Sequence, residues 1–332
     1  MNNIIIKENG LKEIKGIIDD ISPYKTAIIT NKKVYNLFWD VLKEQVDAAV
    51  IIVPDGEEAK TIDTFLSICD KLISMGFSRK SLLIGFGGGA ITDIASFVAS
   101  TYMRGTYLGL IPTTLLGQID AAIGGKTGLD YKGKNLLGTF YNSDFIVIDP
   151  LFLKTLPEKE LKNGLGELVK YALLDKRIYE GVSEIDKLEI PSVDIIKRCI
   201  EFKLSIVERD FREKGKRRIL NLGHTVAHAI EKASDYKISH GAAVSIGLMA
   251  SALMSEILLG FDSTRVKHLL ARFNLPQNHS FRPERLFSLM KNDKKAWQGN
   301  PVFVLLERIG KPVIKEVEKE VVLGALEEIR NG

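Results

Sequence analysis

The first 150 residues alternate short apolar runs with longer segments of helical periodicity, and this pattern restricts the fold more than any other feature of the chain. The short runs lie at 26–30, 49–53, 81–85, 107–111 and 145–149. Between them, segments such as 61–77 space their apolar residues three and four positions apart, as an amphipathic helix does. Strands that alternate with helices in this way predict a parallel sheet with helices on both faces.

The rest of the chain has a different pattern. Helical periodicity recurs at 158–174, 192–210, 225–234 and 262–275, and a late strand at 301–309 and a helix at 318–329 close the sequence. Because 332 residues are too many for one typical hydrophobic core, we expect two domains. We predict a Rossmann-like α/β domain over 1–150 and a helix-rich domain over 151–332, with the functional site in the cleft between them.

Composition excludes several classes of protein. The chain is 45% hydrophobic and 27% charged, as globular proteins are, and its net charge of +4 is too mild to indicate nucleic-acid binding. The basic run at 214–218 fits a surface loop, and Cys69 and Cys199 show no metal or disulfide spacing. The N-terminal apolar stretch is too short for a signal peptide. The apolar segment 242–260 contains serines and Glu256, which favours a buried core helix over a membrane span. We therefore expect a soluble, cytoplasmic protein.

A glycine-rich turn, "GFGGGAITD", follows the strand predicted at 81–85. Consecutive glycines let backbone N–H groups approach a pyrophosphate, and the start of the next helix attracts its negative charge. The turn matches G-x-G-x-x-A through Gly85, Gly87 and Ala90, but it follows the third predicted strand and no acidic residue stands about 20 positions on. The usual dinucleotide fingerprint is therefore not met, and a tight turn without a ligand is the alternative.

Polar segments also follow other predicted strands, at 53–60, 111–128 and 131–135. The carboxyl ends of parallel strands share one edge of the sheet, which is where ligands bind in open α/β folds. Together these segments favour a bound nucleotide.

Three of the five histidines, His224, His228 and His240, lie within 17 residues. His224 and His228 are four positions apart, so they share one helix face and have the spacing of a zinc-binding pair. Glu167 stands among apolar neighbours, where an unpaired carboxylate is costly to bury, and is a candidate third ligand. The alternatives are hydrogen-bonded core histidines and a glutamate on a helix surface.

The second half also carries many polar and charged side chains around this cluster. Taken singly, each fits a solvated helix charge; taken together, their cations suit an anionic small molecule. They are Lys170, Lys203, Glu213, Arg217, Asn221, Lys294 and Lys295.

At this point the motifs match a known family. The stretches "PDGEEAK", "GGGAITD", "TYMRG", "PTTLLGQIDAAIGGKTG", "GKNLLGTFY", "LKTLPEKELKNGLGELVKY", "LNLGHTVAHAIE" and "SHGAAVSIGLM" occur in family order and at family-like spacing. On these stretches the chain resembles the 3-dehydroquinate synthases of the shikimate pathway along nearly its whole length. The resemblance implies an NAD- and metal-dependent lyase that converts 3-deoxy-D-arabino-heptulosonate 7-phosphate to 3-dehydroquinate and phosphate. The implied chemistry is transient oxidation at C5 by NAD, β-elimination of phosphate, re-reduction and intramolecular aldol closure.

The resemblance also assigns roles within the histidine cluster. It implies that Glu167, His224 and His240 bind the metal, Zn²⁺ or Co²⁺, and leave coordination positions open for substrate. His228 then becomes a hydrogen-bonding or proton-transfer residue near the substrate. The resemblance therefore gives different roles to His224, a metal ligand, and His228, a residue near the substrate.

Further positions match the family's anion clamps and cofactor site. Arg104 matches an arginine that reaches the phosphate from a partner subunit, which implies a homodimer, and Asp120 matches an active-site acid. The implied clamps for carboxylate and phosphate are Lys126, Lys170, Lys203, Arg217 and Lys294 or Lys295, with Asn135 and Asn221. The implied NAD-binding residues are Asp55, Gly56, Glu57, Glu58, Ala59, Lys60, Gly89, Ala90, Ile91, Thr92, Asp93, Thr113, Thr114, Lys126, Lys134, Phe152, Leu153, Lys154 and Thr155.

The sequence departs from the family pattern at a few positions. Asn31 stands where an aspartate usually holds the adenosine ribose, which leaves the cofactor affinity at this point open, and Ala227, Ala242 and Phe211 replace other usual residues. None of these changes removes a proposed ligand or clamp. The rival interpretations are another sugar-phosphate cyclase, a metal-dependent glycerol-type dehydrogenase, and a non-catalytic NAD-binding protein.

Overall fold

The computed structural model describes residues 3–185, 188–291 and 301–330. The chain forms two compact units, residues 1–156 and 157–332. Each unit has its own hydrophobic core. The cleft predicted between the two domains stays a prediction.

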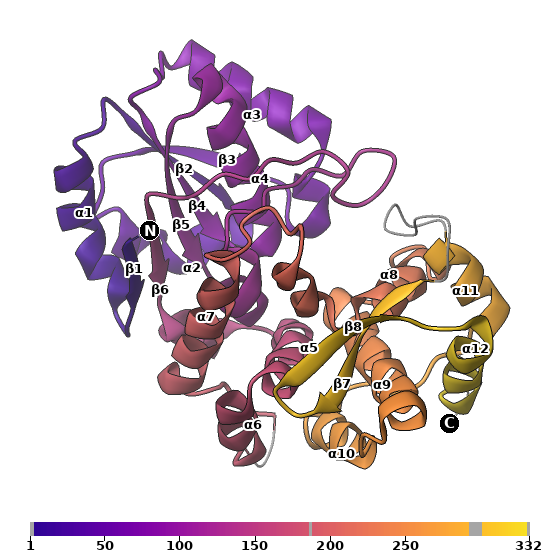
Figure 1. Ribbon diagram of the computed structural model, residues 1–332. Helices are drawn as coiled ribbons and strands as arrows, with labels where there is room; N and C mark the ends of the chain where they lie inside the picture. Colours follow the sequence, from indigo (N-terminus) through magenta and orange to yellow (C-terminus); the bar gives the residue numbers. More distant parts are fainter. Residues whose placement is uncertain (1–2, 186–187, 292–300, 331–332) are drawn as a thin grey trace. The chain divides into compact units, whose positions relative to one another are not determined.

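The first unit contains a six-stranded parallel sheet in the order β1-β6-β5-β4-β2-β3 (Figure 1). Its strands are β1 (Asn3–Ile6), β2 (Thr26–Asn31), β3 (Ala49–Val53), β4 (Leu82–Gly87), β5 (Tyr107–Pro112) and β6 (Phe145–Ile148). This sheet confirms the predicted α/β fold. The prediction missed β1, because a four-residue edge strand with a single apolar run carries too little pattern to be recognised.

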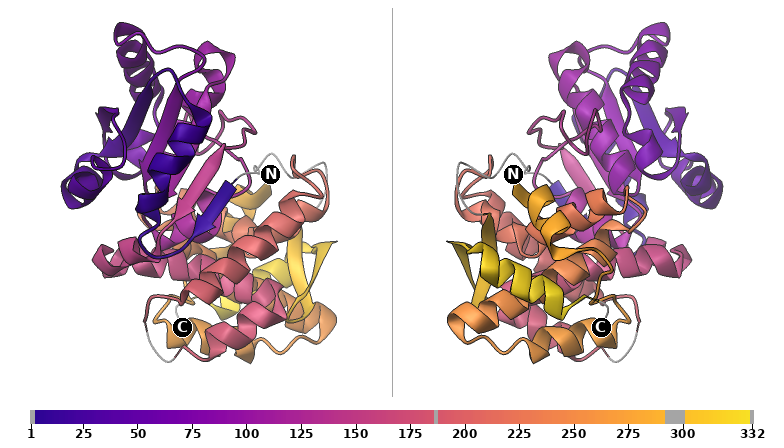
Figure 2. Two further views of the ribbon diagram at one scale, coloured as in Figure 1. Left: turned by 90° about the vertical axis from the view of Figure 1, so that its left-hand side faces the viewer. Right: turned by 90° about the vertical axis from the view of Figure 1, so that its right-hand side faces the viewer.

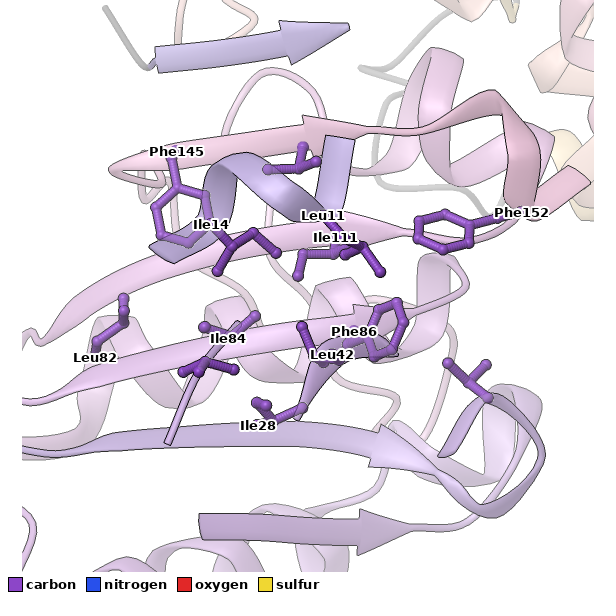
Figure 3. Packing of buried hydrophobic residues seen from close by; sticks show 13 residues of the cluster. Leu11, Ile14, Ile28, Leu42, Leu82, Ile84, Phe86, Ile111, Phe145 and Phe152 are labelled. Carbon is purple, nitrogen blue, oxygen red and sulfur yellow. The ribbon is translucent and has the colours of Figure 1, made fainter. Parts of the chain in front are cut away.

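Helices cover both faces of this sheet. They are α1 (Ile14–Ile21), α2 (Lys32–Leu42), α3 (Ile62–Ser74) and α4 (Gly89–Thr101). On one face, Ile28, Ile84, Phe86 and Phe145 join α1 and α2 in a buried cluster, shown in Figure 3. On the other face, Gly85 lies against Ala95 of α4, where a Cβ on the glycine would come within 2.8 Å. Strands buried on both faces explain the continuous apolar runs of the sequence.

The strand order places a topological switch point between β2 and β4. The chain leaves β2 toward β3 on one side, and it leaves β4 toward β5 on the other. In open parallel sheets, ligands bind at the carboxyl ends of the strands beside such a point. Asn31 ends β2 and Gly87 ends β4, so the glycine turn lies at this position.

The second unit is mainly helical and carries a two-stranded antiparallel ribbon, visible in yellow in Figure 2. Its elements are α5 (Glu158–Leu174), α6 (Lys176–Ser183), α7 (Val193–Val207), α8 (His224–Ala233), α9 (His240–Leu259), α10 (Thr264–Arg272), α11 (Pro283–Lys291), β7 (Val302–Arg308), β8 (Lys311–Glu316) and α12 (Lys319–Glu328). β8 was not predicted, because its charged, largely exposed sequence lacks the apolar pattern of a strand.

The apolar helix α9 organises the second unit. It is the one helix of the described residues that is long and apolar enough to cross a membrane, but 72% of its most apolar window is buried inside the protein. It packs against α5, α8, β7 and α12. The prediction of a core helix is confirmed.

Candidate metal centre and cofactor site

Three helices bring a carboxylate and two imidazoles together. Glu167 lies in α5, His224 is the first residue of α8, and His240 is the first residue of α9. The ligand atoms of these residues all lie within 4.8 Å of one another. Glu167 Oε1 is 3.2 Å from His224 Nε2 and 2.9 Å from His240 Nε2. One oxygen and two nitrogens facing a common point are a donor set that suits a divalent transition metal.

His228 does not join this group, although it follows His224 by one helical turn. Its ring centroid is 5.7 Å from that of His224, and the two rings are nearly perpendicular. Among the described residues, the group of ligand atoms that lie close together contains His240 and not His228. The group that the structure gathers is the one implied by the family resemblance.

Glycines beside the three candidate ligands let the helices approach closely enough. A Cβ on Gly166, next to Glu167, would overlap the backbone of Gly241, next to His240. A Cβ on Gly241 would overlap the backbone oxygen of Asn163, whose side chain accepts a hydrogen bond from the Gly241 N–H at 2.5 Å. Gly223, with φ +78°, precedes His224 and lies against α9. Backbone contact between helices thus sets the distances between the ligand atoms.

This contact makes Gly241→Ala a test of how the site is positioned. The added methyl group would meet backbone atoms of Asn163 in α5, which no side-chain rotamer change can move, so α5 and α9 must separate. We expect a loss of about 1–3 kcal/mol in the free energy of unfolding and weaker zinc binding, measured by urea unfolding and chelator competition.

Gly324→Ala is the matched control, because Gly324 lies within α12 and a Cβ added to it would have no other atom within 4 Å. It should stabilise the protein by about 0.5–1 kcal/mol and leave zinc binding unchanged. Equal effects of the two substitutions would contradict the positioning role of Gly241.

Hydrogen bonds to the far side of each imidazole fix which nitrogen faces the centre. Nδ1 of His224 lies 3.1 Å from the carbonyl oxygen of Leu222, and Nδ1 of His240 lies 3.2 Å from Glu231 Oε1. Both partners are acceptors, so with a metal at the centre each Nδ1 would carry the proton and each Nε2 would offer its lone pair to the metal.

A buried cation supports the Glu167 carboxylate. Lys170 Nζ lies 2.5 Å from Glu167 Oε2, and both side chains are buried. Burial opposes ionisation of Glu167, but the charges of Lys170 and His224 and the histidine hydrogen bonds outweigh it and hold the pKa of the carboxyl well below its ordinary value. Burial lowers the pKa of His224. For His240, burial is outweighed by the hydrogen bonds to Glu167 and Glu231, which raise its pKa to about 9.

The candidate substrate residues of the second unit have mixed placements. Asn221 and His228 line an open hollow with His224, and the apolar residues Val302, Val304 and Ile314 also line it. Arg217 is buried, and its guanidinium donates to the carbonyl oxygen of Phe211 at 2.6 Å.

Two further contacts concern the other candidates of this unit. The Asn221 amide donates to Glu213 Oε1 at 2.5 Å, so these two residues are joined directly. Lys203 is buried in α7. Lys294 and Lys295 lie outside the described residues.

In the first unit, Lys60 connects three of the polar segments that follow strands. Its buried ammonium donates to Asp93 Oδ2 at 2.7 Å and to Asn135 Oδ1 at 2.5 Å. Asp130 accepts the Asn135 N–H and donates its own N–H to the Lys60 carbonyl. Asn135, expected among the substrate clamps, therefore contacts residues expected to bind the cofactor.

The glycine turn presents the start of α4 without an obstructing side chain. Gly88 is the N-cap residue, and no side chain caps the first turn of the helix. A Cβ on Gly88 would come within 3.1 Å of Thr114, and one on Gly89 within 3.2 Å of Ala121. Free N–H groups in the first turn and room for close approach suit the diphosphate of a dinucleotide.

Asn31, the departure from the family pattern, pairs with a carboxylate. Its Oδ1 caps α2 by accepting the Val34 N–H at 2.8 Å, and its Nδ2 donates to Asp55 Oδ1 at 2.7 Å. An aspartate at position 31 would place two carboxylate oxygens at this distance. The amide is therefore matched to Asp55, which follows the neighbouring strand β3.

A double-mutant cycle tests this match. Asn31→Asp should lower the free energy of unfolding by about 1 kcal/mol, because Asp caps helices as well as Asn but repels Asp55. Adding Asp55→Asn exchanges donor and acceptor and should restore most of the loss, with a coupling of about 0.5–3 kcal/mol in urea unfolding. Additive effects of the two substitutions would show that the pair does not interact.

The remaining candidates lie in several settings. Asp120 belongs to a short π-helical turn, and Lys126 forms an isolated bridge with Phe140. Arg104 has a left-handed backbone conformation with φ +62°. The Phe152 side chain is buried in the sheet core. Glu231 was missed as a functional candidate, and its one sequence signal is an acidic residue within the apolar face of 226–233.

Comparison with known protein families covers both units. The model of the 3-dehydroquinate synthase N-terminal domain matches residues 50–163, and that of the C-terminal domain matches residues 164–296. A 3-dehydroquinate synthase of Pyrococcus abyssi is 52% identical, over 99% of this chain and 100% of that protein.

Solved structures give the same picture at lower identity. A 2-deoxy-scyllo-inosose synthase complexed with carbaglucose-6-phosphate, NAD⁺ and Co²⁺ is 25% identical, with a TM-score of 0.89 over 98% of this chain and 96% of that one. A 2-epi-5-epi-valiolone synthase from Streptomyces hygroscopicus with NAD⁺ and Zn²⁺ bound is 27% identical, with a TM-score of 0.85 over 99% and 96% of the two chains.

Proposed function

Since the chain belongs to the 3-dehydroquinate synthase family and has that activity as an NAD- and metal-dependent lyase, we propose how its residues divide the work. The observation that carries the assignment is the Glu167–His224–His240 group, in which Nε2 of each imidazole faces Glu167 and an acceptor lies at each Nδ1. A dehydrogenase could use such a group as well. The sugar phosphate as substrate follows from the family.

Glu167, His224 and His240 would hold one zinc or cobalt ion. Three protein ligands leave coordination positions for substrate hydroxyls, as a catalytic site needs. When bound, the metal polarises the C5 hydroxyl of the sugar, and NAD takes up and returns the electron pair. Lys170 keeps Glu167 ionised and so preserves the charge that the metal requires.

The cations of the second unit would bind the carboxylate and phosphate of the substrate. Lys203 and Arg217 are held in buried positions, where a fixed cation binds a carboxylate or phosphate more strongly than a solvated one. The Glu213–Asn221 hydrogen bond orients the Asn221 amide in the hollow beside His224. His228 lines the same hollow, so its imidazole would accept or return a proton at a substrate oxygen.

NAD would bind at the carboxyl edge of the sheet. The turn at Gly88 and the start of α4 would take the diphosphate, with Thr114 beside them. Asp55, held by Asn31, would accept a ribose hydroxyl. Lys60 would fix the surrounding segments through Asp93 and Asn135.

We place the enzyme in the cytoplasm as a homodimer. The dimer is proposed from the family resemblance, in which Arg104 matches an arginine that acts on the partner subunit; its backbone has φ +62°. Its guanidinium would reach the phosphate bound by the partner subunit.

One incubation tests the proposal. Purified protein with the heptulosonate phosphate, NAD and zinc should release phosphate and form 3-dehydroquinate, identified by mass spectrometry, without net NADH. Chelation should stop phosphate release, and zinc or cobalt should restore it. Full activity in metal-free protein would contradict the metal assignment, and accumulating NADH would favour a dehydrogenase.

A further inference from the structure

Glu231 is a buried carboxylate that the proposed reaction does not use. It lies in α8, three residues after His228, and only 3% of its surface is exposed. Burying a carboxylate is costly unless it forms specific hydrogen bonds. Its Oε1 lies 3.2 Å from Nδ1 of His240, which belongs to the next helix.

The contact is made on the side of His240 that faces away from the centre. Nε2 of this imidazole faces Glu167 at 2.9 Å, and Nδ1 faces Glu231 at 3.2 Å. Among the described residues, Glu231 is not part of the group that gathers ligand atoms. It would therefore act through His240 and not as a ligand of the metal.

The two imidazoles have different supports. His224 has a neutral backbone carbonyl, that of Leu222, at its Nδ1, whereas His240 has a carboxylate. A carboxylate behind a ligating histidine fixes the ring and makes the opposite nitrogen a stronger donor. His240 should accordingly be the stronger nitrogen ligand of the two.

Glu231 also anchors the turn that leads to His240. Its backbone carbonyl accepts the Tyr236 N–H at 2.8 Å, and Asp235 and Tyr236 both have left-handed backbone conformations. The side chain of Glu231 thus contacts the His240 imidazole, and its backbone holds the turn that precedes His240. From these contacts we infer that Glu231 is a positioning residue that sets the orientation and donor strength of His240 toward the metal, an inference that rests on the proposed metal site.

Two substitutions and a control test this role. Glu231→Leu removes the acceptor, and Glu231→Gln keeps an acceptor oxygen without the charge. Glu256→Gln is the control, because Glu256 accepts a hydrogen bond from Ser263 near the other end of α9. The measurements are zinc affinity by competition with a chromophoric chelator, the visible absorption of the Co²⁺ protein, and the melting temperature of the metal-free protein.

We expect zinc binding about 10- to 100-fold weaker in Glu231→Leu, a smaller loss in Glu231→Gln, and no change in Glu256→Gln. The Co²⁺ bands should shift in both Glu231 variants, and the Gln variant supplies the result if the Leu variant does not fold. Wild-type affinity and unchanged Co²⁺ bands in the variants, with only a lower melting temperature, would overturn the inference and leave the proposed function intact. Absence of zinc binding by the unsubstituted protein would overturn both.

Discussion

Glu167→Gln is expected to abolish metal binding and to lower the rate of phosphate release at least about a thousand-fold, or about 4 kcal/mol of transition-state stabilisation. The amide keeps the shape of the side chain but removes the only anionic ligand of the group. It also removes the carboxylate charge that lies 2.5 Å from the buried Lys170 ammonium. Removing one partner of a buried ion pair costs about 3–5 kcal/mol, so the free energy of unfolding should fall as well.

A second substitution distinguishes the loss of metal binding from the loss of stability. The double variant with Lys170→Met removes both charges of this buried pair, so stability should recover while zinc binding stays absent. Glu158→Gln, an exposed residue of the same helix paired with Lys162 at 2.8 Å, should leave metal content and activity unchanged. Zinc measured by atomic absorption at one ion per chain in Glu167→Gln would show that Glu167 is not a ligand.

His228→Asn is expected to separate catalysis from metal binding. Loss of the proton-transfer imidazole should reduce kcat about 100- to 10,000-fold. Zinc content should stay at one ion per chain, because His228 lies outside the group of ligand atoms formed by Glu167, His224 and His240.

His268→Asn is the matched histidine control, because His268 is exposed on α10. It should affect neither the rate nor the zinc content. If His228→Asn loses its zinc, His228 belongs among the ligands and the helix-face pair with His224 is the better assignment.

The parallel sheet and the helical second unit could be predicted, because both depend on local patterns. Strands buried on two faces leave continuous apolar runs, as β2 and β4 do. The two missed strands lack that pattern for physical reasons. β1 is four residues long at a sheet edge, and β8 exposes charged side chains on a two-stranded ribbon.

The metal centre was less predictable from spacing. The rule that residues four apart share a helix face holds for His224 and His228, but it does not say which ligands neighbouring helices supply. His224 begins α8, where it meets the start of α9 and the middle of α5. The glycine contacts that bring these helices together lie far apart in the sequence, and the group that the structure gathers is the one that the family resemblance implied.

Contacts behind the ligands could not be predicted at all. The support of His240 by Glu231 depends on the turn between α8 and α9, where Asp235 and Tyr236 adopt positive φ. The pairing of Asn31 with Asp55 joins the ends of two adjacent strands. In the sequence, Asn31 is only a departure from the family pattern; in the structure, it is the partner of a carboxylate.

Anomalous X-ray scattering at the zinc edge, from crystals of the protein grown with zinc, tests the metal site most directly. One peak is expected per chain, about 2.0–2.2 Å from Glu167 Oε1, His224 Nε2 and His240 Nε2. His228 and Glu231 should lie outside that distance. A peak bound by His224 and His228 without His240, or no peak near Glu167, would contradict the assignment.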